Sequence, residues 1–149
     1  MSETVLIGLG NAFRGDDGVG LLVARRLREL ALPGLTVLEQ SGEGAALLEA
    51  WAGADRVIVV DAVSSGGAPG AIHRLEVGQQ PLPAHFSTGS THAFGLAEAV
   101  ELARQLDRLP ASLLIYGIEG RSYELGTGLS PEVQSAADKV IDQLIADLA

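Results

Sequence analysis

Two patterns of hydrophobic and polar positions alternate along the chain. Short, nearly continuous apolar runs are typical of strands covered on both faces, and apolar residues repeating every three or four positions are typical of amphipathic helices. The continuous runs lie at residues 4–7, 35–38, 57–60 and 113–118, and an alternating run at 71–77 is typical of an edge strand. Helical spacing covers residues 19–30, 45–51, about 92–106, and 131 to the C-terminus.

This order of elements predicts an α/β fold: a three-layer α/β/α sandwich whose mostly parallel, twisted sheet of about five strands carries helices on both faces. The 149 residues fit a single domain, 1–149, without a repeat or a linker. Pro33-Gly34 is expected to end the first helix, and the hydroxyl of Ser130 to cap the last one. Ligands of such sheets bind beyond the carboxyl ends of the strands, near the switch point in strand order, so residues that follow strands are candidates for function.

Composition and charge narrow the class of partner. The formal net charge of −9 disfavours nucleic acid and favours cations or basic peptides. Three arginines share one helix, and we interpret them as a solvated face: Arg25, Arg26 and Arg28. The chain has no cysteine, which excludes disulfides and thiolate chemistry. Without a membrane-spanning apolar run or a signal sequence, a cytoplasmic protein with no membrane partner is expected.

A glycine-rich loop, "GLGNAFRGDDGVG", follows the first predicted strand. Such loops often cradle phosphate, but the adjacent carboxylates of Asp16 and Asp17 would repel it. Phe13 also stands where the dinucleotide fingerprint G-x-G-x-x-G needs glycine, so no nucleotide cofactor is expected. Neither a phosphate-binding G-x-x-x-x-G-K-[S/T] nor a G-x-S-x-G nucleophile motif occurs.

Polar groups at three positions are expected to meet at the carboxyl edge of the sheet. Asp16-Asp17 follow the first strand, Asp61 ends the strand over 57–60, and His92 opens a helix. Two carboxylates and an imidazole form a plausible ligand set for a divalent metal, which would offset the repulsion between the acids. Each has a simpler alternative: a helix cap for either of Asp16 and Asp17, a turn anchor for Asp61, and an ordinary first-turn residue for His92. His85 is a lone loop histidine with no assigned role.

Four segments in this order resemble the hydrogenase maturation endopeptidase family: "VLIGLGNAFRGDDGVG", "VIVVDAVSSGGAPG", "STHAFGLAEAVELA" and "YGIEG…GTGLSPEV". Together they cover nearly the whole chain. Peptidyl-tRNA hydrolases also begin with a G-L-G-N stretch, but their later segments differ. The resemblance implies a cytoplasmic protease that removes the C-terminal peptide of the large-subunit precursor of a [NiFe] hydrogenase after nickel insertion, and that recognises the nickel carried by the precursor.

By position, the metal-contacting residues of the family fall on Asp17, Asp61 and His92. The first is commonly glutamate in the family, so Asp17 is one methylene shorter. Asn11, Asp16 and Glu39 are expected to contact the substrate, although the segment around Glu39 departs from the family pattern. The partner implied is the large-subunit precursor, and the protein itself is expected to be a monomer.

No serine or cysteine nucleophile is evident, which suits a mechanism without one. In this hypothesis Asp17, Asp61 and His92 complete the coordination of the precursor's nickel, and the metal or a carboxylate activates water against a nearby peptide bond. The glycines of the loop are expected to let the backbone approach a bulky substrate. An alternative from a different functional class is a non-catalytic scaffold that senses nickel during hydrogenase assembly.

Overall fold

A computed structural model describes residues 4–41, 44–78 and 96–148. Its strands form a five-stranded sheet in the order β2-β1-β3-β5-β4. The strands are β1 (Thr4–Leu9), β2 (Leu35–Gln40), β3 (Arg56–Val63), β4 (Ile72–Glu76) and β5 (Ser112–Glu119). The helices are the 3-10 turn η1 (Gly15–Gly18), α1 (Val19–Leu30), α2 (Gly44–Ala50), α4 (Leu96–Gln105) and α5 (Pro131–Leu148).

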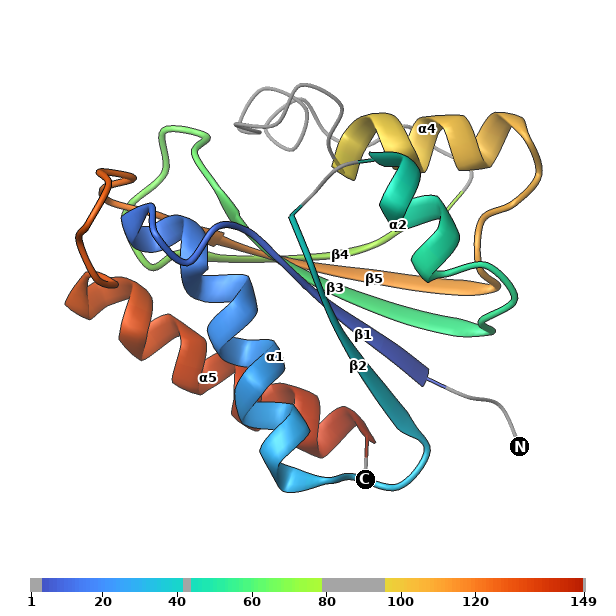
Figure 1. Cartoon of the computed structure of the whole chain (residues 1–149), viewed down its shortest axis with the longest axis horizontal. Coiled ribbons are helices and arrows are strands. Elements are labelled where there is room, and N and C mark those ends of the chain that lie inside the picture. Colours follow the sequence, from blue (N-terminus) through green and yellow to red (C-terminus); the bar gives the residue numbers. More distant parts are fainter. Residues whose placement is uncertain (1–3, 42–43, 79–95, 149) are drawn as a thin grey trace.

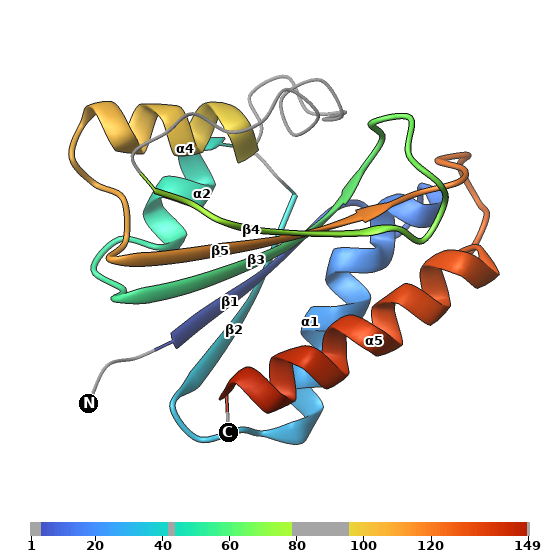
Figure 2. The ribbon, with the colours of Figure 1, turned by 180° about the vertical axis from the view of Figure 1, so that it is seen from behind.

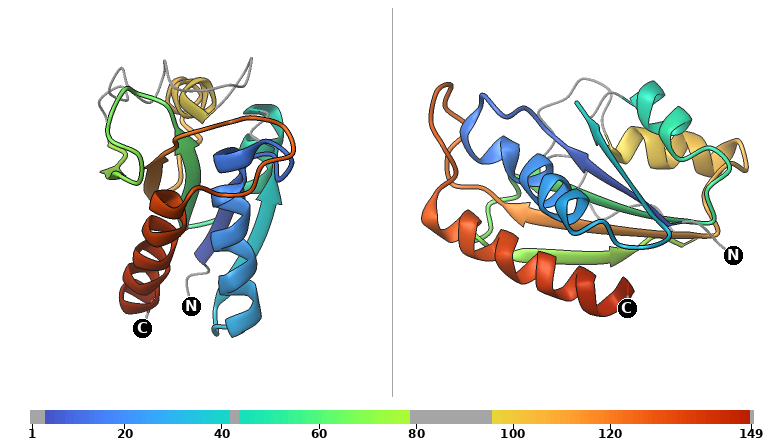
Figure 3. Two further views of the ribbon diagram at one scale, coloured as in Figure 1. Left: turned by 90° about the vertical axis from the view of Figure 1, so that its left-hand side faces the viewer. Right: turned by 60° about the horizontal axis from the view of Figure 1, so that its bottom comes forward.

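The sheet lies between two helical layers, which confirms the predicted fold class. Helices α1 and α5 cover one face, and α2 and α4 cover the other (Figures 1 and 2). The edge-on view in Figure 3 separates the layers. All strand pairs are parallel except β4 with β5, so the predicted edge strand is the antiparallel one.

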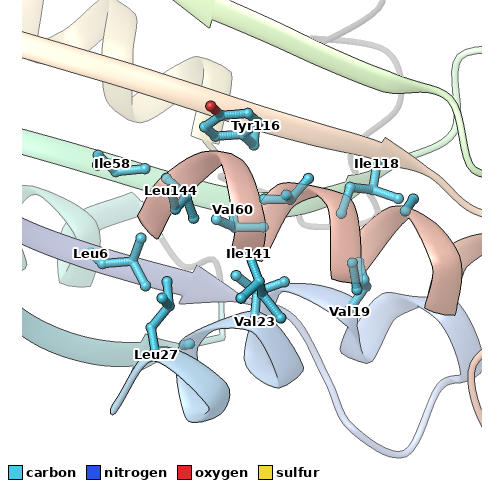
Figure 4. Close-up of a cluster of buried hydrophobic side chains, with 14 of the residues drawn as sticks. Leu6, Val19, Val23, Leu27, Ile58, Val60, Tyr116, Ile118, Ile141 and Leu144 are labelled. Carbon is cyan, nitrogen blue, oxygen red and sulfur yellow. The ribbon is translucent and has the colours of Figure 1, made fainter. Parts of the chain in front are cut away.

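Alternation along the strands divides the core into two clusters. Leu6, Ile58 and Tyr116 point to the α1/α5 face and pack against Leu27 and Leu144 (Figure 4). The intervening strand residues, such as Ile7, Val59 and Ile115, pack against Trp51 and Val100 on the α2/α4 face. Both faces of the central strands are therefore buried, which explains their nearly continuous apolar sequences.

Two glycines bring α1 unusually close to the sheet. A Cβ added at Gly20 would lie 2.3 Å from the Val60 carbonyl oxygen and 2.5 Å from the Leu9 carbonyl oxygen. A Cβ added at Gly8 would lie 2.2 Å from the Gly20 carbonyl oxygen. Because Gly8 and Gly20 face backbone within the fold, the expectation that such glycines make room for substrate is wrong at these two positions.

The switch point lies between β1 and β3. From β1 the chain passes through α1 to β2 on one side, and it then returns through α2 to β3 on the other side. The β1–β3 ladder ends at the Gly8–Val60 pair, while β3 continues along β5 to the Val63–Glu119 pair. The carboxyl ends of β1 and β3 therefore diverge where this fold class binds ligands.

One predicted boundary was wrong: Asp61 does not end its strand, because β3 continues to Val63 through pairing with β5. Helix α1 has the predicted bounds, 19–30. It is ended by Ala31, which adopts the left-handed conformation (φ 49°) and donates its N–H to the Arg28 carbonyl, and Pro33-Gly34 follows only after this cap. In the part of the chain described by the structure, no helix is both long and apolar enough to cross a membrane.

Candidate active site

Asp17 is held by the turn that follows β1. It belongs to η1, and its Oδ2 accepts a hydrogen bond from the Asn11 backbone N–H at 3.0 Å. The turn requires glycine at residue 10, where φ is +142° and a Cβ would lie 1.9 Å from the Asp17 carbonyl oxygen. Helix α1 has Gly18 at its N-cap and no side-chain cap bond, so neither acid caps this helix. Asp17 is nearly buried yet remains at the carboxyl edge of the sheet.

Asp61 lies inside β3, one residue beyond the last pairing with β1. Alternation along the strand places it on the same face as Val59 and Val63, the α2/α4 face. Its side chain is buried, and Oδ1 accepts no hydrogen bond from the described residues. Because β3 continues through Asp61 to Val63, no turn begins at this residue, and the turn-anchor alternative for Asp61 is not supported.

Burial raises the pKa of Asp61 to about 8, and the charge of Asp17 adds to this rise. A backbone hydrogen bond from Ala62 opposes it only in part. Two neighbouring carboxylates at one edge of the sheet, one of them buried, are unfavourable without a cation or a proton. The donor set therefore fits a hard or borderline divalent metal ion.

Asp16 has a different role from its neighbour. It is fully buried, and its carboxylate accepts hydrogen bonds from the backbone N–H groups of Arg121, Ser122 and Ser130 at 2.7, 3.1 and 2.7 Å. The Ser130 hydroxyl also donates to it, at 2.9 Å from Oδ2. Burial alone would raise the pKa of Asp16, but these hydrogen bonds outweigh burial and lower it.

The Asp16 carboxylate therefore ties the β5–α5 loop to η1 and has no exposed oxygen to offer a substrate. This placement argues against the predicted substrate contact of Asp16. The Ser130 hydroxyl donates to Asp16, and the Ser130 carbonyl accepts the Gln134 N–H at the start of α5, as the carbonyl of an N-cap residue does. Capping by the hydroxyl itself stays a prediction.

The other two predicted substrate contacts are at or near the surface. Asn11 is exposed, and its side-chain oxygen accepts the Phe13 N–H at 2.9 Å. Glu39 lies near the end of β2 and forms ion pairs with Arg25 at 2.9 Å and Arg28 at 2.6 Å. The carboxylate of Glu39 is thus engaged with α1, and the two arginines are not simply solvated as expected. Substrate contact by Asn11 and Glu39 stays a prediction.

His92 and His85 lie outside the described residues, so the structure does not place the imidazole expected to join the two carboxylates. Within residues 4–41, 44–78 and 96–148, no group of three histidine, cysteine or acidic side chains is close enough to hold a metal ion. The described part of the site therefore consists of Asp17 and Asp61.

A fourth buried carboxylate, Glu119, was missed by the sequence reasoning. Glu119 ends β5 and is 1% exposed. It accepts hydrogen bonds from the Ser65 backbone N–H and hydroxyl, and it lies 3.1 Å from the His73 Nε2. The register sets His73 opposite Gly117, and Gly117 opposite Asp61, so one row across the sheet joins His73 to the candidate pair. A lone glutamate after an apolar strand was the only available signal in the sequence.

Comparison with known proteins gives the family. The family model of hydrogenase maturation protease, HycI, matches residues 21–147. The chain is 30% identical over 148 residues to the Hydrogenase 2 maturation protease of Escherichia coli K12, and the match covers 97% of this chain and 89% of that protein.

Solved structures agree with this match. The hydrogenase maturating endopeptidase HybD from E. coli superposes with a TM-score of 0.80 at 25% identity, covering 98% of this chain and 91% of that one. The [NiFe] hydrogenase maturation protease HycI from Thermococcus kodakarensis gives a TM-score of 0.72 at 28% identity, covering 99% and 92%. The chain therefore belongs to the hydrogenase maturation protease family, a family of hydrolases.

Proposed function

We propose that this protein is an endopeptidase that removes the C-terminal extension of a nickel-loaded [NiFe] hydrogenase large-subunit precursor. The relative from E. coli is named for maturing hydrogenase 2, and the relative from T. kodakarensis for maturing a [NiFe] hydrogenase. The observation that carries the proposal is the buried Asp61 carboxylate, which has the charge of Asp17 beside it at the switch point and whose Oδ1 accepts no hydrogen bond from residues 4–41, 44–78 or 96–148.

In this proposal the nickel belongs to the substrate. Asp17 and Asp61, with His92 as the third expected ligand, bind the metal that the precursor already carries, and no nucleotide cofactor takes part. Before the substrate arrives, the proton held by Asp61 limits the repulsion between the two acids. Binding a cation in its place supplies the missing partner for Oδ1, so recognition depends on whether the precursor has been loaded.

Cleavage then needs one water molecule and a base. The water oxygen attacks the carbonyl carbon of the scissile peptide while a carboxylate takes a proton from the water. The C–N bond breaks, and the amine of the extension leaves with a proton. An aspartate can bind a metal through one oxygen and accept a proton on the other, so a carboxylate of the pair can serve as this base. Holding the scissile peptide beside Asp17 and Asp61 also increases the rate, because the reacting groups are already oriented.

A gel-shift assay tests the proposal. The purified protein is mixed with the precursor from its own organism, loaded with nickel in one sample and nickel-free in another. We expect shortening of the loaded precursor only, and no shortening with Asp61→Asn. The matched control is Asp142→Asn, an exposed acid on α5. Binding of the loaded precursor without any shortening would favour the nickel-sensing scaffold instead.

A further inference from the structure

The two most exposed large hydrophobic residues of the described chain lie on neighbouring loops. Phe13 is 77% exposed on the β1–α1 loop, and Leu125 is 75% exposed on the β5–α5 loop. The Gly126 N–H donates to the Phe13 carbonyl at 2.9 Å, and the two loops run side by side in Figures 1 and 3. Single exposed apolar residues are ordinary, but two of them on loops that are bonded to each other form a candidate interaction surface.

These loops form one fixed platform. The Asp16 carboxylate bonds the β5–α5 loop at Arg121, Ser122 and Ser130. The Asp16 N–H also donates to the Ser122 carbonyl at 2.9 Å. These links fix the β5–α5 loop on both sides of Leu125, and the Gly126–Phe13 bond ties the loop to the β1–α1 loop, so less conformational freedom is lost when a partner binds.

The platform is continuous with the candidate catalytic pair. The Phe13 N–H donates to the Asn11 side chain, and the Asn11 N–H donates to the Asp17 carboxylate. Two hydrogen bonds thus connect the backbone of Phe13 to the carboxylate of Asp17. The exposed Phe13 therefore belongs to the same loop as the candidate catalytic carboxylate.

We propose that Phe13 and Leu125 form an exosite that binds an apolar surface on the body of the protein substrate, beside the extension to be removed. The inference rests on the proposed function and adds the surface by which the folded substrate is held. A peptide tail alone offers little area, whereas a few desolvated residues near the centre of an interface carry most of the binding energy of protein complexes. Phenylalanine is among the residue types enriched in interfaces.

The test measures kcat and KM for the nickel-loaded precursor with the wild type, Phe13→Ser, Leu125→Ser and the double variant. The control is Leu106→Ser, because Leu106 is 50% exposed and lies just before the start of β5, at the opposite edge of the sheet. We expect the double variant to raise KM about 10-fold or more with kcat nearly unchanged. Thermal unfolding of every variant should stay close to that of the wild type, since the replaced side chains are exposed.

Normal cleavage by the double variant with an unchanged KM would overturn the exosite while leaving the proposed function intact. Failure of the wild type itself to cleave would instead overturn the proposed function, and with it the partner named here. Analytical ultracentrifugation of the wild type and the double variant tests the alternative that a second copy of this chain binds the Phe13–Leu125 surface. Self-association that the double variant abolishes, with KM unchanged, would assign the surface to a dimer and contradict the exosite.

Discussion

Asp17 raises the pKa of Asp61 from the opposite side of the switch point, with one residue on the turn after β1 and the other inside β3. Burial of Asp61 is the larger cause, and the neighbouring charge acts in the same direction. The pair therefore holds a proton near neutral pH at the place where a substrate metal is proposed to bind. The free energy of unfolding should therefore depend on pH through the proton held by Asp61.

The stability of Asp61→Asn relative to that of the wild type should increase as pH rises. With a pKa of about 8 in the folded state, Asp61 binds a proton more tightly there than in the unfolded chain, where its value is about 4. Between these values the folded state carries more protons, so the contribution of Asp61 to stability falls with rising pH, by at most about 1.4 kcal/mol per pH unit.

Urea unfolding of both proteins at pH 5, 6, 7 and 8 measures this difference. Asp142→Asn is the control, because that side chain is exposed on α5. A difference between Asp61→Asn and the wild type that does not change with pH would show that Asp61 is ionised normally in the folded protein.

Asp16→Asn should destabilise the fold by about 2–4 kcal/mol at pH 7, because an amide NH₂ would face donors that now bond to a buried carboxylate. The lowered pKa of Asp16 gives a second expectation. Its stabilising contribution is present above the ordinary aspartate pKa of about 4 and is lost as pH falls below that value. Urea unfolding from pH 7 to pH 2.5 checks both, and equal stability of variant and wild type at neutral pH would contradict the anchoring role.

Gly20→Ala should destabilise the protein by roughly 1–3 kcal/mol or more, since the added methyl would overlap the backbone carbonyls of Val60 and Leu9. Helix α1 would have to move away from the sheet, and η1 with Asp17 would move with it. We expect a lower melting temperature in calorimetry. Gly128→Ala is the control, because a Cβ there would meet nothing within 4 Å, and an equal loss in both variants would refute the close-packing explanation.

Glu119→Gln should destabilise the protein by about 1–3 kcal/mol, because the buried carboxylate accepts from both the N–H and the hydroxyl of Ser65. Hydrogen exchange at the Ser65 amide should quicken in the variant. Glu124→Gln, at an exposed loop position, is the control. Unchanged protection of Ser65 would show that Glu119 does not hold this loop.

The layers of the fold could be predicted because strand and helix patterns act locally. Apolar runs such as Val57–Val60 identify buried strands, and the alternating run near Ile72 identified the edge strand. The end of β3 could not be predicted, because Asp61 looks like a strand terminator. Only pairing with Gly117 on β5 keeps it within the sheet.

The candidate site was predictable in part. Its location follows from the switch-point rule, which pointed to Asp16-Asp17 and Asp61, and the family resemblance then singled out Asp17. The anchoring role of Asp16 could not be predicted, because the residues that bond to its carboxylate lie 105 to 114 positions away along the chain. The Glu119–His73 contact was hidden for the same reason, with 46 residues between its members.

Intact-mass spectrometry of the nickel-loaded precursor after incubation with this protein tests the central claim most directly. Hydrolysis predicts two products whose masses sum to that of the precursor plus one water, with the smaller product carrying the original C-terminus. Asp61→Asn should yield neither product, while Asp142→Asn should yield both. A precursor that keeps its full mass after binding the wild-type protein would contradict the endopeptidase assignment.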